Sequence, residues 1–422
     1  MAATDEIRSL FPALSRKVYG KNLVYFDNAA TVQRPQSVID CWNRITRDSN
    51  ANIHRAVHLL AEEATDAYES ARDAVRNFIN ASSREEVIFT SGATASINLV
   101  AFSFGEAFVG EGDEVIVSEA EHHSDIVPWQ MMCRRRGAAL KVLPVDDTGH
   151  LRLDLLDSLI TSRTRIVAVT HISNVLGLIN PVKDIVARCH SEGVPVLIDG
   201  AQGIVHRNVD VQDLDCDFYV FSGHKMYAVP GTGVLYGKMK WLERMPPFMT
   251  GGEMVGTVSF SGTTFAPLPM KFEAGTQNFS GAATLKTAVD MALIMRGEGV
   301  GVNDGCCVSH RKELLENEAA VRDYLLDKLL SDNRIHLYGI PSAAEEKIPL
   351  FSFTVEGVHH EDLALILDKM GIALRSGQMC AEPLMDRFGV TGMLRASLVA
   401  YNTMEEAEYF ISSLDKAIKM LV

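Results

Sequence analysis

Two charged residues that follow buried strands carry the strongest chemical signal in the chain. Lys225 stands in Ser222-Gly223-His224-Lys225 after the apolar run 218–221, and Asp199 follows the apolar run 196–198. Ligands of open α/β folds collect where the strands end. Pyridoxal phosphate needs such a pair, because a lysine forms a Schiff base with its aldehyde and an acid keeps its pyridine nitrogen protonated. We therefore predict a pyridoxal phosphate site, rather than a surface lysine and an unrelated capping aspartate.

A third strand end supplies small and hydroxylated residues. The run 87–89 leads into Thr90-Ser91-Gly92-Ala93-Thr94, ahead of an apolar helix. Small residues allow backbone N–H groups and hydroxyls to converge on an anion at a helix N-terminus. A Ser/Thr capping turn is the alternative. Ser222 and His224 beside the lysine favour a phosphate cradle.

Three further polar residues follow strand ends. An imidazole stacked on the cofactor ring could move protons near neutral pH, and of the pair His122-His123 we choose His123 for this role. Asn174 could donate to a ring oxygen or a substrate carboxylate, and Gln202 is placed to reach a ring hydroxyl. Turn formation is the alternative for Asn174 and Gln202, and a helix-start surface position for the histidines.

The stretch Arg375-Ser376-Gly377-Gln378-Met379-Cys380-Ala381 presents a thiol in polar surroundings. Gly377 permits a tight or mobile loop, so Cys380 is expected to be accessible. Cysteine attacks as the thiolate, and a nearby arginine favours that form. Cys380 is therefore a candidate nucleophile, with a chemically silent loop cysteine as the alternative.

The remaining histidine pair does not predict a metal site. His54 and His58 are four residues apart, but the stretch has no HExxH arrangement and no nearby cysteine. We expect no metal, and we expect His54 and Arg55 to reach an active-site entrance.

Composition excludes several classes of function. The chain of 422 residues has a formal net charge of −14, which argues against nucleic-acid binding. No stretch approaches a membrane span, and the acidic N-terminus does not resemble a secretory signal. Seven cysteines without a CxxC pair fit a reducing compartment. We expect a cytoplasmic protein that binds neither nucleic acid nor membrane.

The elements that must position these residues alternate between strands and helices. The strands predicted at 87–89, 114–117, 140–143, 165–170, 196–198 and 218–221 are separated by helix-length segments, which favours a mainly parallel sheet covered on both faces. An irregular passage over 245–281 is expected to be functional and to cross a subunit boundary. Later strands and helices predict a small α+β domain. We predict an α/β fold in three parts: an N-terminal segment 1–22 packing on the small domain, a large domain 23–290, and a small domain 291–422 that carries the cysteine loop.

Together these motifs resemble SufS-type cysteine desulfurases, within the class V aminotransferase group of fold-type I pyridoxal phosphate enzymes. The likeness covers nearly the whole chain, from Tyr25-Phe26-Asp27-Asn28-Ala29-Ala30-Thr31 to Tyr401-Asn402-Thr403. It implies a homodimer. The residues implied to bind the cofactor are Lys225, Asp199, Gln202, His123, Ala93, Thr94, Ser222, His224 and, from the second subunit, Thr276. Those implied to bind the substrate are Asn174, Arg395, Arg375, His54 and Arg55.

The resemblance also implies an activity. Cys380 would take sulfur from L-cysteine as a persulfide and leave L-alanine. An acceptor protein of the SufE or SufU type would collect that sulfur for iron-sulfur cluster assembly. Selenocysteine lyase is an alternative, as is another class V aminotransferase or β-lyase, since fold does not fix reaction. The joint presence of Lys225, Asp199 and Cys380 disfavours a non-catalytic sulfur-transfer scaffold.

Three departures from the family pattern concern rate or partner binding rather than the cofactor. Met379 stands where the family often has histidine, and Tyr227-Ala228-Val229-Pro230-Gly231 differs from the usual Gly-Pro-Thr-Gly order. Ala93-Thr94-Ala95 replaces a more polar Thr-Thr-Glu.

Overall fold

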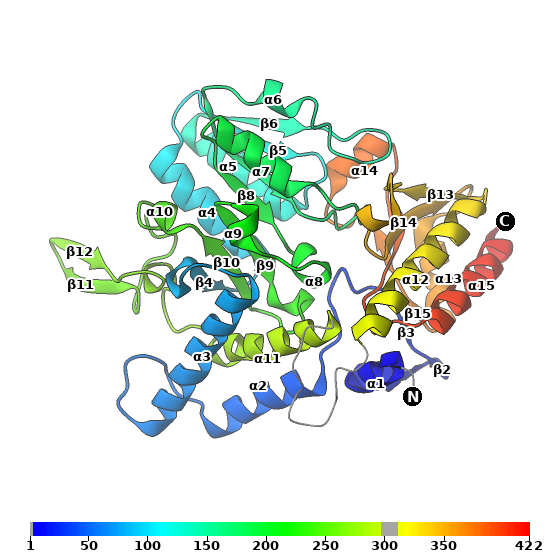
Figure 1. Cartoon of the computed structure of the whole chain (residues 1–422), viewed down its shortest axis with the longest axis horizontal. Helices are drawn as coiled ribbons and strands as arrows, with labels where there is room; N and C mark the ends of the chain where they lie inside the picture. The colour runs from blue at the N-terminus through cyan, green and yellow to red at the C-terminus, as the bar shows by residue number, and fades with distance from the viewer. Residues whose placement is uncertain (1–2, 297–310) are drawn as a thin grey trace.

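The larger part of the molecule is built on one seven-stranded sheet (Figure 1). The computed structural model describes residues 3–296 and 311–422. The sheet order is β4-β10-β9-β8-β7-β5-β6, and β10 runs in the opposite direction to the other six strands. The bounds are β4 Val87–Thr90, β5 Glu114–Ser118, β6 Ala139–Leu143, β7 Thr164–Thr170, β8 Val196–Asp199, β9 Phe218–Ser222 and β10 Gly233–Gly237. The predicted mainly parallel, mixed sheet is confirmed.

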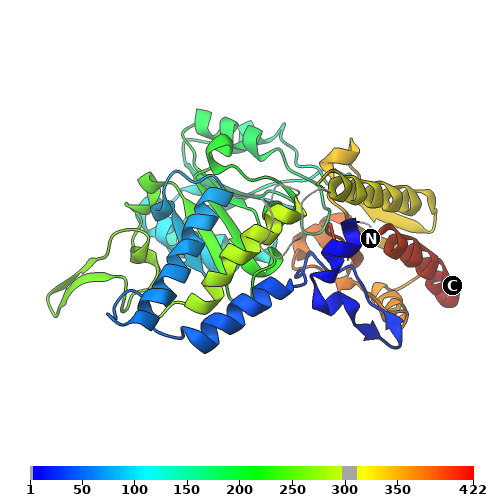
Figure 2. The same cartoon turned by 60° about the horizontal axis from the view of Figure 1, so that its bottom comes forward.

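Helices cover both faces of this sheet. Successive side chains of a strand point to opposite faces, so Leu197 of β8 joins one apolar core while Val196 and Ile198 join the other. The first core includes α4 (Ala93–Phe108) and α5 (Val127–Arg136). The second includes α3 (Leu59–Phe78), α7 (Val182–Ser191) and α11 (Phe279–Met295), with α2 (Gln36–Asp48) beside α3 and α11 (Figure 2). Shorter helices are α6 Leu156–Leu159, α8 Gly203–His206, α9 Val211–Leu214 and α10 Met239–Leu242.

The smaller part is an antiparallel sheet with its own apolar core. Its order is β13-β14-β17-β16, with bounds β13 Ile335–Tyr338, β14 Leu350–Val355, β16 Arg375–Gly377 and β17 Met393–Ser397. Helices α12 (Arg311–Ser331), α13 (His360–Lys369) and α15 (Met404–Leu421) pack on it. Helix α14 (Glu382–Phe388) instead adds Leu384 and Met385 to the core of the large part. The segment before α14 is thereby held against the large sheet.

The N-terminal residues pack on the small sheet. Strand β3 (Val24–Tyr25) pairs in parallel with β15 (Ile372–Ala373), after the short hairpin β1 (Lys17–Val18) and β2 (Lys21–Asn22). Arg8 of α1 (Ala3–Ser9) forms an ion pair of 2.7 Å with Glu406 of α15. Helix α11 continues to Met295, beyond the predicted domain boundary at 290.

The irregular passage over 245–281 contains a hairpin that projects from the body of the molecule in both views (Figures 1 and 2). Its strands are β11 (Val255–Ser259) and β12 (Gly262–Phe265), and Val258 and Phe260 are exposed. A lone two-stranded ribbon is marginally stable in water. Within residues 3–296 and 311–422, no helix combines the length and hydropathy needed to span a membrane.

Candidate active site

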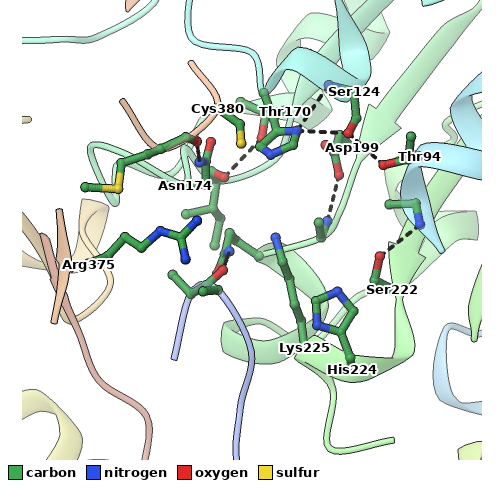
Figure 3. A pocket seen from close by; sticks show the side chains of 18 of the residues that line it. Thr94, Ser124, Thr170, Asn174, Asp199, Ser222, His224, Lys225, Arg375 and Cys380 are labelled. Atoms are coloured by element: carbon green, nitrogen blue, oxygen red, sulfur yellow. Dashed lines mark hydrogen bonds between the residues drawn. The ribbon is translucent and has the colours of Figure 1, made fainter. Parts of the chain in front are cut away.

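The strand ends of the large sheet and the cysteine loop of the small domain enclose one cavity of about 280 Å³ (Figure 3). It lies where the carboxyl ends of β7, β8 and β9 meet, the position at which open α/β sheets bind ligands. Eleven of the predicted site residues line it: Ala93, Thr94, Asn174, Asp199, Gln202, Ser222, His224, Lys225, Arg375, Cys380 and Arg395. Residues that are far apart in the chain therefore meet as the sequence predicts.

Lys225 enters the cavity from a short turn after β9. Gly223 opens that turn, and a Cβ there would lie 2.2 Å from the hydroxyl oxygen of Thr232, so only glycine fits without a shift. None of the described residues forms a hydrogen bond or ion pair with Lys225 Nζ. Burial lowers the pKa of the lysine, while Asp199 opposes this shift. A neutral amine is the nucleophilic form, so a lowered pKa favours condensation of Lys225 with an aldehyde.

Asp199 is the acid that lines the same cavity as Lys225. It ends β8, is 5% exposed, and accepts one hydrogen bond of 2.9 Å at Oδ1 from the backbone N–H of Ala201. Burial raises the pKa of the carboxyl group. A cationic group placed in the cavity would compensate the buried charge, as a protonated ring nitrogen does.

The predicted phosphate cradle would lie where β4 passes into α4. The hydroxyl oxygen of Ser222 accepts a 2.9 Å hydrogen bond from the backbone N–H of Ala93, and Thr94 Oγ1 lies 2.7 Å from Ser124 Oγ. Gly92 and Gly233 permit the close approach of two backbones, since a Cβ on Gly233 would lie 2.4 Å from Gly92 Cα. The helix N-terminus and the hydroxyls thus surround a space suited to an anion.

His122, rather than the predicted His123, lines the cavity. Its Nδ1 accepts a 3.1 Å hydrogen bond from the backbone N–H of Ser124, so the ring proton lies on Nε2. Burial, and then the charge of Lys225, lower its pKa to about 4. The neighbouring side chain points elsewhere, and His123 Nε2 accepts a 3.0 Å hydrogen bond from the backbone N–H of Glu382. His122 and His123 therefore point in different directions. Because both are histidines, the sequence could not show which of them faces the cavity.

The loop that carries Cys380 closes the cavity from the small domain. Cys380 is exposed, and both Met379 and Cys380 have φ near 55°, a region that most residues avoid. Three hydrogen bonds join residues 379–382 to His123 and Asn174: His123 N–H donates to Cys380 O at 2.7 Å, Glu382 N–H donates to His123 Nε2 at 3.0 Å, and Asn174 Nδ2 donates to Met379 O at 2.8 Å. The thiol is therefore both accessible and held against the cavity.

A buried arginine marks the other end of the cavity. Arg395 is 3% exposed and donates from Nη1 to the backbone oxygen of Asn174 at 2.7 Å. Its Nη2 lies 3.3 Å from Asp27 Oδ1, whereas its buried Nε has no hydrogen-bond partner in the described part of the chain. Arg395 thus retains a donor for a carboxylate, and Asp27 is a contact that sequence reasoning missed.

Two further buried acids were not foreseen. Glu121 accepts hydrogen bonds at Oε1 from Ser118 and from the backbone N–H of Thr170, and Asp125 Oδ1 accepts one of 2.7 Å from Trp129. Burial raises the pKa of Glu121 to about 8, with Asp199 adding to the shift. Glu121 could have been noticed because it directly precedes His122 and His123, but the sequence could not show that its carboxyl group is buried.

Besides His123, three of the predicted residues lie outside this cavity. His54 Nε2 is 3.1 Å from Glu69, and Arg55 forms a 2.8 Å ion pair with Glu253. Thr276 comes three residues after Glu273, whose carboxylate accepts two hydrogen bonds from the guanidinium of Arg72. Within the described part of the chain, no three His, Cys, Asp or Glu side chains are grouped to hold a metal ion.

Comparison with known proteins agrees with this geometry. The family model described as aminotransferase class-V matches residues 24–410. The chain belongs to this family. It is 46% identical over 421 residues to a probable cysteine desulfurase of Vibrio cholerae, with both chains fully covered, and 43% identical to a cysteine desulfurase of Cronobacter sakazakii over 99% of this chain and 98% of that one.

Solved structures of cysteine desulfurases show the same fold. The cysteine desulfurase CsdA of Escherichia coli superposes with a TM-score of 0.87 at 37% identity, covering 99% of each chain. A cysteine desulfurase of Thermococcus onnurineus has a TM-score of 0.88 at 33% identity, covering 97% of this chain and 99% of that one. The predicted fold-type I architecture is confirmed.

The cofactor of this class is pyridoxal 5'-phosphate, and the cavity fits it. The buried lysine whose pKa is lowered, the buried acid that ends β8 and the glycine-lined cradle at α4 match its aldehyde, ring nitrogen and phosphate. When bound, the cofactor supplies an electron sink that stabilises negative charge on the substrate α-carbon.

Proposed function

We propose that this protein is a pyridoxal phosphate-dependent cysteine desulfurase, which converts L-cysteine to L-alanine and retains the sulfur as a persulfide on Cys380. One observation carries the proposal: Lys225 and Cys380 line the same cavity although they come from different domains. A transaminase requires the lysine alone. An accessible thiol directed at the same space supplies a nucleophile for the substrate sulfur.

Each residue of the cofactor site has a task in this proposal. Lys225 would hold the cofactor, Asp199 would keep its ring nitrogen protonated, and Gln202 would interact with the ring. His122 would take the ring-stacking role that was predicted for His123, and it would present a proton on Nε2. Ala93, Thr94, Ser222 and His224 would hold the phosphate.

Substrate binding and sulfur transfer use the small domain. Arg395 takes the carboxylate of L-cysteine, with Arg375 nearby. The thiolate of Cys380 then attacks the substrate sulfur, so that an S–S bond forms and the Cβ–S bond breaks. The electron pair of the broken bond stays on Cβ, which takes up a proton and becomes the methyl group of L-alanine. Asn174 contributes by holding both Arg395 and the cysteine loop, and its amide also lines the cavity beside the substrate carboxylate.

A second subunit completes the active site in this proposal. His54, Arg55 and Thr276 lie outside the cavity of their own chain, and the projecting hairpin exposes Val258 and Phe260. A homodimer would cover these apolar side chains and bring the three residues to the partner's cavity. The accessible persulfide then passes to an acceptor protein of the SufE or SufU type for iron-sulfur cluster assembly. The cysteines of the described residues, Cys41, Cys133, Cys189, Cys216 and Cys380, are all free thiols, which supports a cytoplasmic location.

Mass spectrometry of the holoenzyme after addition of L-cysteine tests the proposal. We expect one added sulfur on the peptide that contains Cys380, and one L-alanine for each persulfide in the first turnover. Cys380→Ser should keep the visible absorbance of the bound cofactor and form no persulfide, whereas Lys225→Ala should lose that absorbance. The buried Cys133 offers a matched control, since Cys133→Ser should retain both signals. Unchanged L-cysteine turnover in Cys380→Ser would refute the persulfide mechanism.

A further inference from the structure

Asn174 lies at the tip of a small hairpin that follows the carboxyl end of β7. Ile172 bridges to Ile179 across this hairpin, and residues 173–177 form its tip, closed by a backbone hydrogen bond of 2.9 Å. The hairpin lies outside both the large and the small sheet, so the ladders of those sheets do not fix it. The position of the tip depends on the groups that contact it.

Two hydrogen bonds make the position of Asn174 important for the cavity. Its backbone oxygen accepts a hydrogen bond of 2.7 Å from Arg395 Nη1, and its Nδ2 donates to Met379 O at 2.8 Å, next to Cys380 (Figure 3). A displaced tip would therefore shift a guanidinium and the cysteine loop together. Lys225 would stay in place, because it follows a strand of the large sheet.

The small part of the molecule adds an outer segment to this hairpin. Residues 346–348 run antiparallel to residues 177–179, with Leu178 bridged to Lys347 and a backbone hydrogen bond of 2.9 Å on either side of the bridge. This backbone pairing stops at residue 177. Residues 175 and 176 of the tip are contacted instead by side chains of the small part.

One of these side chains is a buried lysine. Lys347 is 1% exposed, and its Nζ donates to the backbone oxygen of Leu176 on the tip and, at 2.9 Å, to that of Gly339 just after β13. Lysine is rarely buried unless it is paired, yet none of the described acids forms an ion pair with Lys347. Without the amine, two buried carbonyl oxygens on opposite sides of the domain boundary would lose a donor, which is costly.

We propose that Lys347 is a positioning residue for the amino-acid subsite. By holding Leu176 it fixes the hairpin tip, and the tip fixes Arg395 and the cysteine loop through Asn174. Lys347 does not line the cavity, so it acts on the substrate only through these residues. The inference rests on the proposed function in one respect, because it takes Arg395 as the group that binds the substrate carboxylate.

The test compares L-alanine with ethylamine, which is L-alanine without its carboxylate. Each is titrated into the holoenzyme, and binding is followed by the change in the visible absorbance of the bound cofactor. Lys347→Met should raise the dissociation constant of L-alanine about tenfold and change that of ethylamine by less than about twofold. Lys271→Met is the matched control, because Lys271 Nζ also donates to two backbone oxygens, those of Leu242 and Glu243, but lies outside the cavity. It should leave both dissociation constants unchanged.

A second variant keeps the inference falsifiable if Lys347→Met does not fold. Ser352→Ala removes only the hydroxyl that donates to Val175 O at 2.5 Å on the same tip, and it should weaken L-alanine selectively by a smaller factor. Equal weakening of L-alanine and ethylamine, or no weakening of either, would overturn the inference.

The titration requires no sulfur transfer, so the two proposals can fail separately. Selective weakening of L-alanine in a protein that forms no persulfide on Cys380 would contradict the proposed function and leave the role of Lys347 standing. Persulfide formation by the wild type, with unselective effects in Lys347→Met, would overturn the role of Lys347 and leave the proposed function standing.

Discussion

Replacement of His123 by alanine should loosen the Cys380 loop without disturbing the cofactor. The side chain of His123 accepts one hydrogen bond, from the backbone N–H of Glu382 at 3.0 Å, and the variant removes only that bond. The backbone N–H of His123 still donates to Cys380 O at 2.7 Å. A hydrogen bond of this kind contributes about 1 kcal/mol net, which corresponds to an approximately fivefold larger open population of the loop.

The loop is sensitive to such a loss because its conformation is strained. Met379 and Cys380 both have φ near 55°, and the left-handed region costs roughly 1–2 kcal/mol for each residue with a side chain. The surrounding hydrogen bonds must offset this cost in the closed conformation. Removal of one of them therefore favours relaxed conformations in which the thiol leaves the cavity.

Amide hydrogen exchange followed by mass spectrometry measures this opening. We expect about fivefold faster exchange in the peptide spanning 378–385 of His123→Ala. The rate of persulfide formation should fall by no more than a similar factor, and the cofactor absorbance should be unchanged. His359→Ala is a matched control, because His359 also accepts a backbone N–H, that of Glu361 at 3.4 Å, at the start of α13.

The opposite pattern would refute this reasoning. If His123→Ala changed the cofactor absorbance and left loop exchange unchanged, His123 would be the residue that stacks on the ring. His122→Ala should in that case leave the cofactor spectrum as it is.

Two further predictions concern buried charges of the scaffold. Arg72→Met should lower the free energy of unfolding by about 3–5 kcal/mol, because it leaves the buried Glu273 without the guanidinium that donates to it at 2.7 and 2.9 Å. Urea unfolding measures this loss. A free energy of unfolding within about 1 kcal/mol of the wild type would contradict the prediction. Burial lowers the pKa of Lys347 to about 7, so between pH 7 and 9 the unfolded chain binds a proton that the folded chain lacks. Lys347 should therefore raise the free energy of unfolding of the wild type by at most about 1.4 kcal/mol for each pH unit. Denaturant titrations at pH 7 and at pH 9 measure this increase, and Lys347→Met should lack it. An equal increase in both proteins would exclude the effect.

The sequence predicts the sheet well where strands are apolar throughout. All six predicted strands of the large sheet are present. Five of them are largely buried and read as nearly continuous apolar runs, whereas β6 is a partly exposed edge strand that contains Lys141. Strand β10 was missed because its apolar part is only three residues long and lies between Gly233 and Gly237. Its antiparallel direction cannot be inferred from its amino-acid composition. The hairpin of β11 and β12 was also missed, since its exposed residues lack a buried face to set a pattern.

The site was predictable to the extent that strand ends determine it. Lys225, Asp199 and the cradle at Thr94 follow buried strands, so the rule that ligands collect at strand ends places them together. The choice between His122 and His123 depends on the local path of a turn, which residue type does not encode. Asp27 was not recognised because its partners, Arg375 and Arg395, lie more than three hundred residues away in the chain.

The two adjacent histidines connect the halves of the proposed reaction. His122 lines the cavity with Lys225, while His123 binds the backbone of Cys380 and of Glu382. Both follow β5, whose neighbour β7 leads to Asn174, the second contact that the large domain makes with the loop. The distance between the amine and the thiol is therefore set by the rigid sheet rather than by the small domain alone. A change that shifts β5 relative to β9 should then impair sulfur transfer more than it impairs cofactor binding, because the lysine moves with β9 and the thiol with β5 and β7.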